Sequence, residues 1–178
     1  FGYTQQSFFQ AYNTEYSSPF RDTSYEPELG IKIEKDWQLP LNINLRLIRL
    51  ALVHQSNGQT KPLSRSWNRV MGTAIADWGE NWTIAIRPWV RIPDDEDSDD
   101  NPDIIDYFGY GELYLQHRLG KNRLNLMLRS NIETDKKTVQ LSWSRPTWWN
   151  KDIQFYIQYF HGYGESLVDY NHQVNRLG

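Results

Sequence analysis

The residues best suited to chemistry lie in one short segment, where His54, Ser56 and Asn68 occur within fifteen positions. A serine hydroxyl becomes a nucleophile when a neighbouring imidazole accepts its proton, and the imidazole needs a partner that fixes its tautomer. Asn68 suits that role, because an amide oxygen accepts a ring N–H much as a carboxylate does. Gly58 follows closely and offers an unhindered backbone N–H to an oxyanion. Together these residues predict a serine hydrolase.

The segment that carries the first two of these residues has the alternation of a β-strand. His54 and Ser56 share the parity of Ile48, Leu50 and Leu52, so all five side chains are expected on one face. Asn68 is expected on the next strand, across a hairpin. If the apolar face contacts lipid, the catalytic pair faces lipid too, and polar groups placed there are costly enough to indicate a function.

Similar alternation recurs along most of the chain and predicts antiparallel strands joined by hairpins. Gly120-Lys121-Asn122 has the composition of a tight turn between two of them. The acidic stretch 94–103 is expected to be a solvated loop at the membrane surface. Arginines of the opposite parity are expected to face a polar interior and to form ion pairs there with glutamates such as Glu112; they are Arg49, Arg69, Arg87 and Arg129.

The composition fits a membrane protein built as a β-barrel better than one built from spanning helices. Mean hydropathy is −0.72 and only 39% of the residues are hydrophobic. No run of about 20 apolar residues suggests a spanning helix. Barrel strands need apolar residues only at alternate positions, and 15% aromatic residues suit interfacial girdles. The absence of cysteine excludes disulfides and cysteine-based metal sites, and the net charge of −3 argues against nucleic-acid binding.

Several motifs resemble the outer membrane phospholipase A family, in the order in which that family has them. The most specific are His54-x-Ser56-Asn57-Gly58 and the run from Ser64 to Arg69, SRSWNR. Others are Tyr3-Thr4-Gln5, Ser17-Ser18-Pro19-Phe20-Arg21, Tyr25-Glu26-Pro27, Asp99-Asp100-Asn101-Pro102-Asp103-Ile104, Gly162-Tyr163-Gly164-Glu165-Ser166-Leu167 and Asp169-Tyr170-Asn171.

This resemblance implies an all-β fold, an antiparallel transmembrane β-barrel of twelve strands in the bacterial outer membrane. The protein would cross that membrane many times, with its active site toward the outer leaflet. The sequence itself shows about eight or nine strands. Residues 1–178 are therefore expected to form a single barrel domain that lacks N-terminal strands and the last strand, with closure supplied by the rest of the protein.

The resemblance also implies a calcium-dependent serine hydrolase of the phospholipase A1/A2 type. Its substrates would be membrane glycerophospholipids, cleaved at the sn-1 and sn-2 esters, and lysophospholipids. Ser56 would be the nucleophile, His54 the base and Asn68 the orienting amide, with Gly58 at the oxyanion. The active form would be a homodimer surrounded by outer-membrane lipid, with Gln5 at the dimer contact.

Calcium ligands follow from the same resemblance. Ser64 would contribute its hydroxyl, Gln59 its backbone carbonyl, and Ser17 would reach across from the partner chain. Asp100 would provide a second, weaker Ca²⁺ contact, and oxygen donors are what this cation prefers. Lys61 stands where the family commonly has an acidic residue, and a cation at that position is expected to weaken calcium binding.

Two alternatives from other functional classes stay open on the sequence. His54-x-Ser56 is a common short pattern, and Asn57-Gly58 is also typical of a simple turn. A non-enzymatic barrel, such as a channel or an adhesin, would not react with serine-directed reagents. A soluble β-rich esterase would keep the triad but bury its apolar residues in a packed core.

Overall fold

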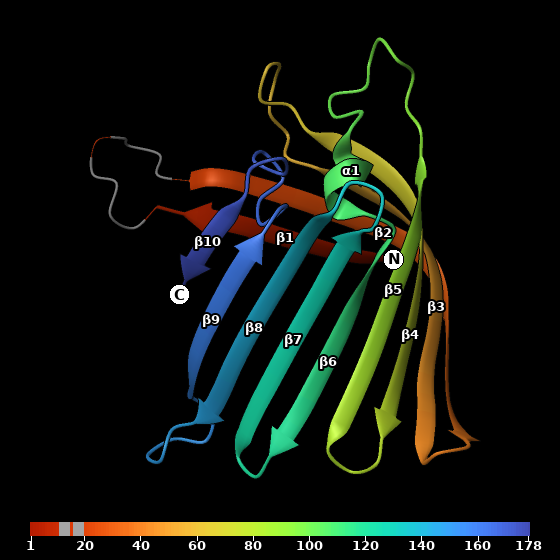
Figure 1. Ribbon diagram of the computed structural model, residues 1–178, viewed down its shortest axis with the longest axis vertical. Helices are drawn as coiled ribbons and strands as arrows, with labels where there is room; N and C mark the ends of the chain where they lie inside the picture. The colour runs from red at the N-terminus through yellow and green to blue at the C-terminus, as the bar shows by residue number, and fades with distance from the viewer. Residues whose placement is uncertain (11–14, 16–19) are drawn as a thin grey trace.

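A computed structural model describes residues 1–10, 15 and 20–178. Within this part of the chain it contains ten strands and one short helix. The elements are β1 (Gly2–Phe9), β2 (Phe20–Leu39), β3 (Ile43–Ser56), β4 (Ser66–Trp78), β5 (Trp82–Ile92), α1 (Ile104–Phe108), β6 (Gly111–Leu119), β7 (Asn122–Asn131), β8 (Lys136–Pro146), β9 (Gln154–Gly162) and β10 (Val174–Leu177). The view in Figure 1 shows most strands lying side by side along the long axis.

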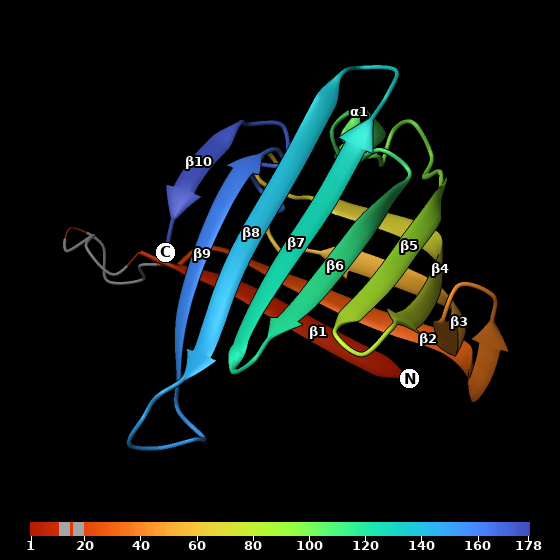
Figure 2. The same ribbon diagram turned by 60° about the horizontal axis from the view of Figure 1, so that its bottom comes forward.

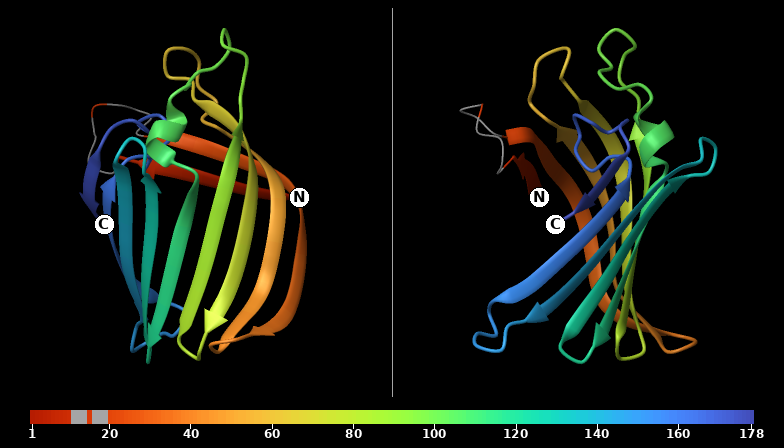
Figure 3. Two further views of the ribbon diagram at one scale, coloured as in Figure 1. Left: turned by 45° about the vertical axis from the view of Figure 1, so that its right-hand side comes forward. Right: turned by 60° about the vertical axis from the view of Figure 1, so that its left-hand side comes forward.

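The strands form one antiparallel sheet in sequence order, in which each strand pairs with its neighbours along the chain. Figures 2 and 3 show that this sheet is strongly curved and wraps around an interior. The turn at Gly120 and Lys121 joins β6 to β7, as predicted. The strand count exceeds the expected eight or nine in the described residues, because a strand of four residues such as β10 is too short to show alternation.

The two faces of the sheet have opposite polarity, which confirms the barrel-type fold. Apolar residues point outward, and Ile31, Leu50 and Val90 are 73%, 54% and 70% exposed. Charged residues point inward, and Arg69 and Arg129 are only 4% and 6% exposed. An apolar exterior around a polar interior is the pattern of a sheet bathed in lipid. This arrangement of an apolar exterior around a polar interior does not agree with the packed core of a soluble esterase.

The upper end of the curved sheet is closed by α1 and a small apolar core (Figure 1). Ile104 and Phe108 of α1 are buried there against Trp67 and Trp89. The indole N–H of Trp89 donates to the carbonyl of Gly109 at 2.8 Å, which ties the end of α1 to β5. Among the described residues, we find no helix with the length and hydrophobicity needed to cross a membrane.

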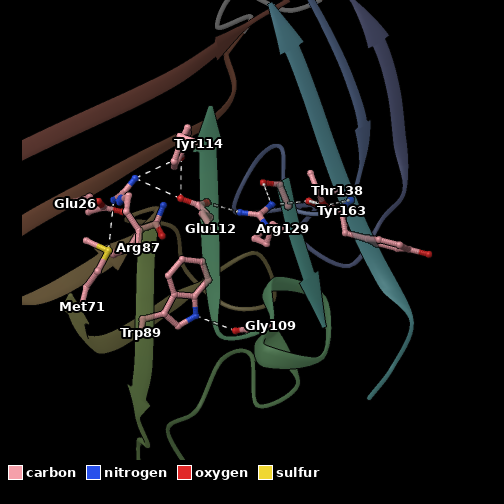
Figure 4. Close-up of polar contacts among 12 residues, drawn as sticks. Glu26, Met71, Arg87, Trp89, Gly109, Glu112, Tyr114, Arg129, Thr138 and Tyr163 are labelled. Atoms are coloured by element: carbon pink, nitrogen blue, oxygen red, sulfur yellow. Dashed lines mark hydrogen bonds and ion pairs between the residues drawn. The ribbon is translucent and has the colours of Figure 1, made fainter. Parts of the chain in front are cut away.

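A polar network lies below this core, and Figure 4 shows Glu112 between Arg87 and Arg129 at its centre. Glu112 of β6 accepts hydrogen bonds from Arg87 of β5 at 3.3 Å, from Arg129 of β7 at 3.1 Å and from the hydroxyl of Tyr114 at 2.8 Å. Arg69 pairs with Glu26 at 2.6 Å, and Arg49 pairs with Glu28. The predicted interior ion pairs are therefore confirmed.

Candidate active site

His54 and Asn68 lie opposite each other on neighbouring strands, as the sequence predicted. They are register partners in the β3–β4 pair, and His54 Nδ1 is 2.8 Å from Asn68 Oδ1. His54 is exposed, whereas Ala51 and Val53 are each 3% exposed, so the imidazole projects from the outer face. With Nδ1 held by an amide oxygen, the proton sits on Nδ1 and Nε2 is left as the basic nitrogen.

Ser56 is the last residue of β3 and is partly buried. It lies two residues beyond His54, and the pleat therefore directs both side chains to the outer face. Its register partners are Tyr25 on β2 and Ser66 on β4. The predicted nucleophile thus stands at the upper end of the outer wall, where the strand passes into the 57–65 loop.

The loop that follows Ser56 is ordered by the buried side chain of Asn57, which is 2% exposed. Its amide oxygen accepts from the backbone N–H of Arg65 at 2.9 Å and of Gln59 at 3.3 Å, and its Nδ2 donates to the carbonyl of Leu63 at 2.9 Å. Gly58 has φ +64°, a left-handed conformation that favours glycine. The hydrogen bonds of the Asn57 side chain therefore hold this segment as an ordered loop, rather than the simple turn that Asn-Gly also suggests.

The acidic segment 94–103 is less solvated than expected, because several of its carboxylates bind neighbouring strands. Asp94 Oδ1 accepts from Asn68 Nδ2 at 3.0 Å, which extends the chain of contacts from His54 through Asn68. Asp99 accepts two hydrogen bonds from Arg91 Nη2, each of 2.7 Å. Asp95, Glu96 and Asp97 stay exposed. No local pattern in the sequence indicates this role for Asp94, since its contact with Asn68 depends on how β4 and β5 pair.

The residues expected to bind a metal are partly brought together. The Ser64 hydroxyl donates to Asp100 Oδ2 at 2.5 Å, and Lys61 Nζ is 3.8 Å from Asp100 Oδ1. Gln59 lies in the same loop, and Ser17 falls outside the described residues. Within the described ranges, no cluster of three or more His, Cys, Asp or Glu side chains has the arrangement of a metal site.

Gln5 lies on β1 with Tyr25 of β2 as its register partner, and Tyr25 is in turn the partner of Ser56. The Gln5 side chain accepts a hydrogen bond from the hydroxyl of Tyr3 at 3.2 Å and donates one to Ser7 Oγ at 3.5 Å. Gln5 therefore shares the outer face with the candidate nucleophile. An exposed amide on a lipid-facing wall is costly unless a partner satisfies it.

An apolar groove adjoins His54 on the outer wall. Its volume is about 380 Å³, and His54 and Asn68 form part of its lining. Most of the other lining residues are apolar, and they are Phe1, Pro27, Leu29, Leu52, Val53 and Ile92, with Glu28 and Arg69 beside them. The candidate base is thus next to a surface that suits a hydrocarbon chain.

The loop between β9 and β10 joins the upper end of the sheet to other strands. Asp22 of β2 accepts from the backbone N–H groups of Leu167 and Val168 at 2.8 and 3.0 Å. The Tyr170 hydroxyl donates to Asp103, and burial together with this hydrogen bond raises the pKa of Tyr170. The Tyr170 hydroxyl therefore connects this loop to the end of the 94–103 segment.

Comparison with known sequences identifies the family of this chain. A family model described as Phospholipase A1 matches residues 1–178. A putative phospholipase A1 of Neisseria meningitidis serogroup B is 43% identical over 181 residues, covering 100% of this chain and 47% of that protein. The phospholipase A1 of Escherichia coli K12 is 39% identical over 176 residues, covering 99% of this chain and 58% of that protein. The chain spans about half the length of these curated relatives.

Solved structures share the fold. Outer membrane phospholipase A from Escherichia coli superimposes with a TM-score of 0.91 at 39% identity, covering 99% of this chain and 70% of that one. The Salmonella typhi outer membrane phospholipase, described as a dimer with bound calcium, also gives 0.91 at 39% identity, covering 99% of this chain and 66% of that one. Matched over its whole length and sharing this fold, the chain is part of a bacterial outer-membrane protein and belongs to the phospholipase A1 family.

Proposed function

We propose that the protein containing this chain is a calcium-dependent outer-membrane phospholipase that hydrolyses sn-1 and sn-2 esters of glycerophospholipids and lysophospholipids. The proposal rests mainly on one observation: His54 is hydrogen-bonded to Asn68 on the lipid-facing wall, beside Ser56 and an apolar groove. Support also comes from a similar Escherichia coli structure, 38% identical, described as an active-site mutant with asparagine replaced by alanine.

The reaction proceeds by acyl transfer through the serine. Ser56 Oγ attacks the ester carbonyl while His54 Nε2 accepts its proton, and Asn68 stabilises the imidazolium through Nδ1. The backbone N–H of Gly58 donates to the oxyanion. The C–O bond to the glycerol then breaks, and His54 returns the proton to the departing alkoxide. Water activated by His54 hydrolyses the acyl-enzyme, which releases the fatty acid and restores the serine.

Substrate reaches this site sideways from the bilayer, because the site lies on the outer wall. One acyl chain lies in the groove between Leu29, Leu52 and Ile92, which places its ester at the upper, polar end of the wall beside Ser56. A second copy of the protein covers this face in the active homodimer. Gln5 forms a hydrogen bond across that interface, which satisfies an amide that otherwise faces hydrocarbon.

The residues near Ser56 provide some, but not all, of the oxygen donors that a calcium ion needs. Ser64 and Asp100 lie in direct contact, and Gln59 offers a backbone carbonyl in the same loop. Ca²⁺ needs six to eight oxygen ligands, so the partner subunit's Ser17 and water would supply the remainder. Lys61 is 71% exposed, and its ammonium can therefore leave Asp100 without loss of a buried contact. When bound, the ion adds positive charge near the oxyanion.

Calcium removal tests this function directly. We expect EDTA to lower phospholipid hydrolysis by the full-length protein in detergent by about 100-fold or more, because a bound cation contributes several kcal/mol of oxyanion stabilisation. Excess Ca²⁺ should restore the rate. Asp100→Asn should raise the Ca²⁺ concentration needed for half of the maximal rate, whereas Asp97→Asn, an exposed neighbour, should not. Full turnover in EDTA would reject the metal assignment.

Asp94 and Asn68 should act as one unit in orienting His54. We expect Asn68→Ala to lower kcat by about 10- to 100-fold, as for a lost hydrogen bond to a charged group, and Asp94→Ala by about threefold to tenfold. In the double variant, loss of Asp94 should add nothing, because its effect passes through Asn68.

Asp95→Ala is the matched control, since it removes the same charge from the same loop. The measurement is the steady-state rate of phospholipid hydrolysis by each of these four variants. Additive losses in the double variant would show that Asp94 does not act through the asparagine.

A further inference from the structure

A second apolar groove lies at the other end of the outer wall, far from His54 along the strands. A groove of about 440 Å³ lies over β6 to β9 there, and most of its lining is apolar. Its residues are Trp82, Leu115, His117, Leu124, Asn125, Leu126, Leu141, Ser142, Trp143, Ile157 and Tyr159. His117 stacks on Trp82 with ring centroids 4.2 Å apart, and the Trp143 indole donates to Asn122 at 3.1 Å.

Positive charge gathers at the end of this groove. The β6–β7 and β8–β9 turns and their flanking residues carry five exposed cationic side chains, Arg118, Lys121, Arg123, Arg145 and Lys151, against a single acidic one, Asp152. Arg145 follows Trp143 by two residues on β8 and so shares its outer face, and Lys121 lies in the β6–β7 turn. Arg118 and Arg123 are register partners with the parity of Glu112 and Arg129, so their side chains belong to the interior face. In the described part of the chain, none of the five has a carboxylate oxygen within 4.0 Å.

This charge is local to these two turns. The β2–β3 and β4–β5 turns, at the same end of the sheet (Figure 1), carry Lys35 and Arg46 against Asp36, Asp77 and Glu80. Arg46 is already paired with Asp77 at 2.7 Å. The opposite end of the molecule bears the acidic 94–103 loop. A belt of cations around the whole end of the sheet would not produce this difference between the turns.

Aromatic residues place this end at the membrane interface. Trp148 and Trp149 are 86% and 58% exposed beside Phe155, and amphipathic rings collect at the headgroup level of a bilayer. Short turns are typical of the periplasmic end of an outer-membrane sheet. A lipid in the groove would therefore have its chain among Leu124, Leu141 and Ile157. Its headgroup would lie at the end of the groove, beside Arg145 and the lysines of the two turns, Lys121 and Lys151.

We infer that this groove, with Arg145, Lys121 and Lys151 at its end, binds one phospholipid with an anionic headgroup from the periplasmic leaflet. Basic clusters at the mouths of apolar grooves recognise such lipids in other membrane proteins. The bound lipid is not a substrate, because the groove is on a different part of the wall from Ser56 and contains no nucleophile with a base partner.

The test uses the full-length protein with Ser56→Ala, so that hydrolysis cannot consume the lipid and the result does not depend on the proposed activity. The protein is reconstituted in mixed phosphatidylethanolamine and phosphatidylglycerol vesicles, extracted in mild detergent, and its retained lipids are counted by native mass spectrometry. We expect phosphatidylglycerol to be retained beyond its share of the vesicle. Lys121→Gln with Arg145→Gln should lower that preference by about tenfold, as removal of two interfacial cations predicts.

Two further variants separate the site from general electrostatics. Lys35→Gln with Arg46→Gln removes the same charge from the β2–β3 end and should leave the preference unchanged. Leu126→Trp fills the groove while keeping every cation and should abolish retention. Equal loss in both charge variants, undiminished retention in Lys121→Gln with Arg145→Gln, or full retention with Leu126→Trp would each overturn the inference.

Discussion

Ser56→Ala should reduce phospholipid hydrolysis by about 10⁴-fold or more, because removal of the nucleophile from a triad leaves only the weak catalysis of binding and oxyanion contacts. Ser56 is only partly buried, and the change removes one oxygen atom, so the fold should be kept. The measurement is fatty-acid release by the full-length protein in detergent with calcium, with unchanged heat-modifiable migration on gels as the check on folding.

Ser66→Ala is the matched control, since Ser66 is the register partner of Ser56 on β4 and its substitution should leave most activity. A fluorophosphonate should label the unmodified protein and the Ser66→Ala variant, but not Ser56→Ala. A folded, active Ser56→Ala protein would end the proposed mechanism. Absence of labelling and of hydrolysis in the unmodified protein would instead favour a channel or an adhesin.

Glu112→Gln should cause the largest loss of stability among single substitutions in the interior, about 3–5 kcal/mol. Glu112 is the anion shared by Arg87 and Arg129, and the Arg129 side chain is only 5% exposed (Figure 4). The neutral amide keeps the shape of the side chain but leaves two largely buried guanidinium groups without their counter-ion. The measurement is the free energy of unfolding in urea, followed by tryptophan fluorescence of the full-length protein in lipid vesicles.

The control for this prediction is Asp77→Asn, which breaks an exposed pair with Arg46 on the same sheet. Its side chains are 30% and 44% exposed, and such pairs contribute at most about 1 kcal/mol. Should Glu112→Gln prove no more destabilising than Asp77→Asn, the interior network would not stabilise the sheet as its burial suggests.

The outward direction of His54 could be predicted from the sequence because strand geometry has a period of two residues. Once Leu50 and Leu52 are taken to face lipid, parity alone places His54 on the same side and Arg49 on the other. The pairing of His54 with Asn68 was also within reach, because both lie on strands joined by one hairpin. The inward arginines and their glutamate partners followed from the same alternation.

Contacts between segments far apart in the chain could not be predicted in this way. Asp94 reaches Asn68, and Asp100 reaches Ser64, only because β4 and β5 pair in one register and the 94–103 loop folds back over them. Alternation says which face a side chain takes, and nothing about where a loop without periodicity will lie. The position of Arg145 near Lys121, beside one groove, likewise depends on the β7–β8 pairing.

By itself, then, the sequence determined most of the strands, their two faces, and the candidates for nucleophile, base and orienting amide, because these depend on local spacing and residue chemistry. Only the tertiary structure decided which carboxylate supports the amide, how α1 closes the upper end, and where Lys61 meets Asp100. These features arise from long-range packing of loops against the sheet, whose geometry is set by hydrogen bonds and burial between distant segments.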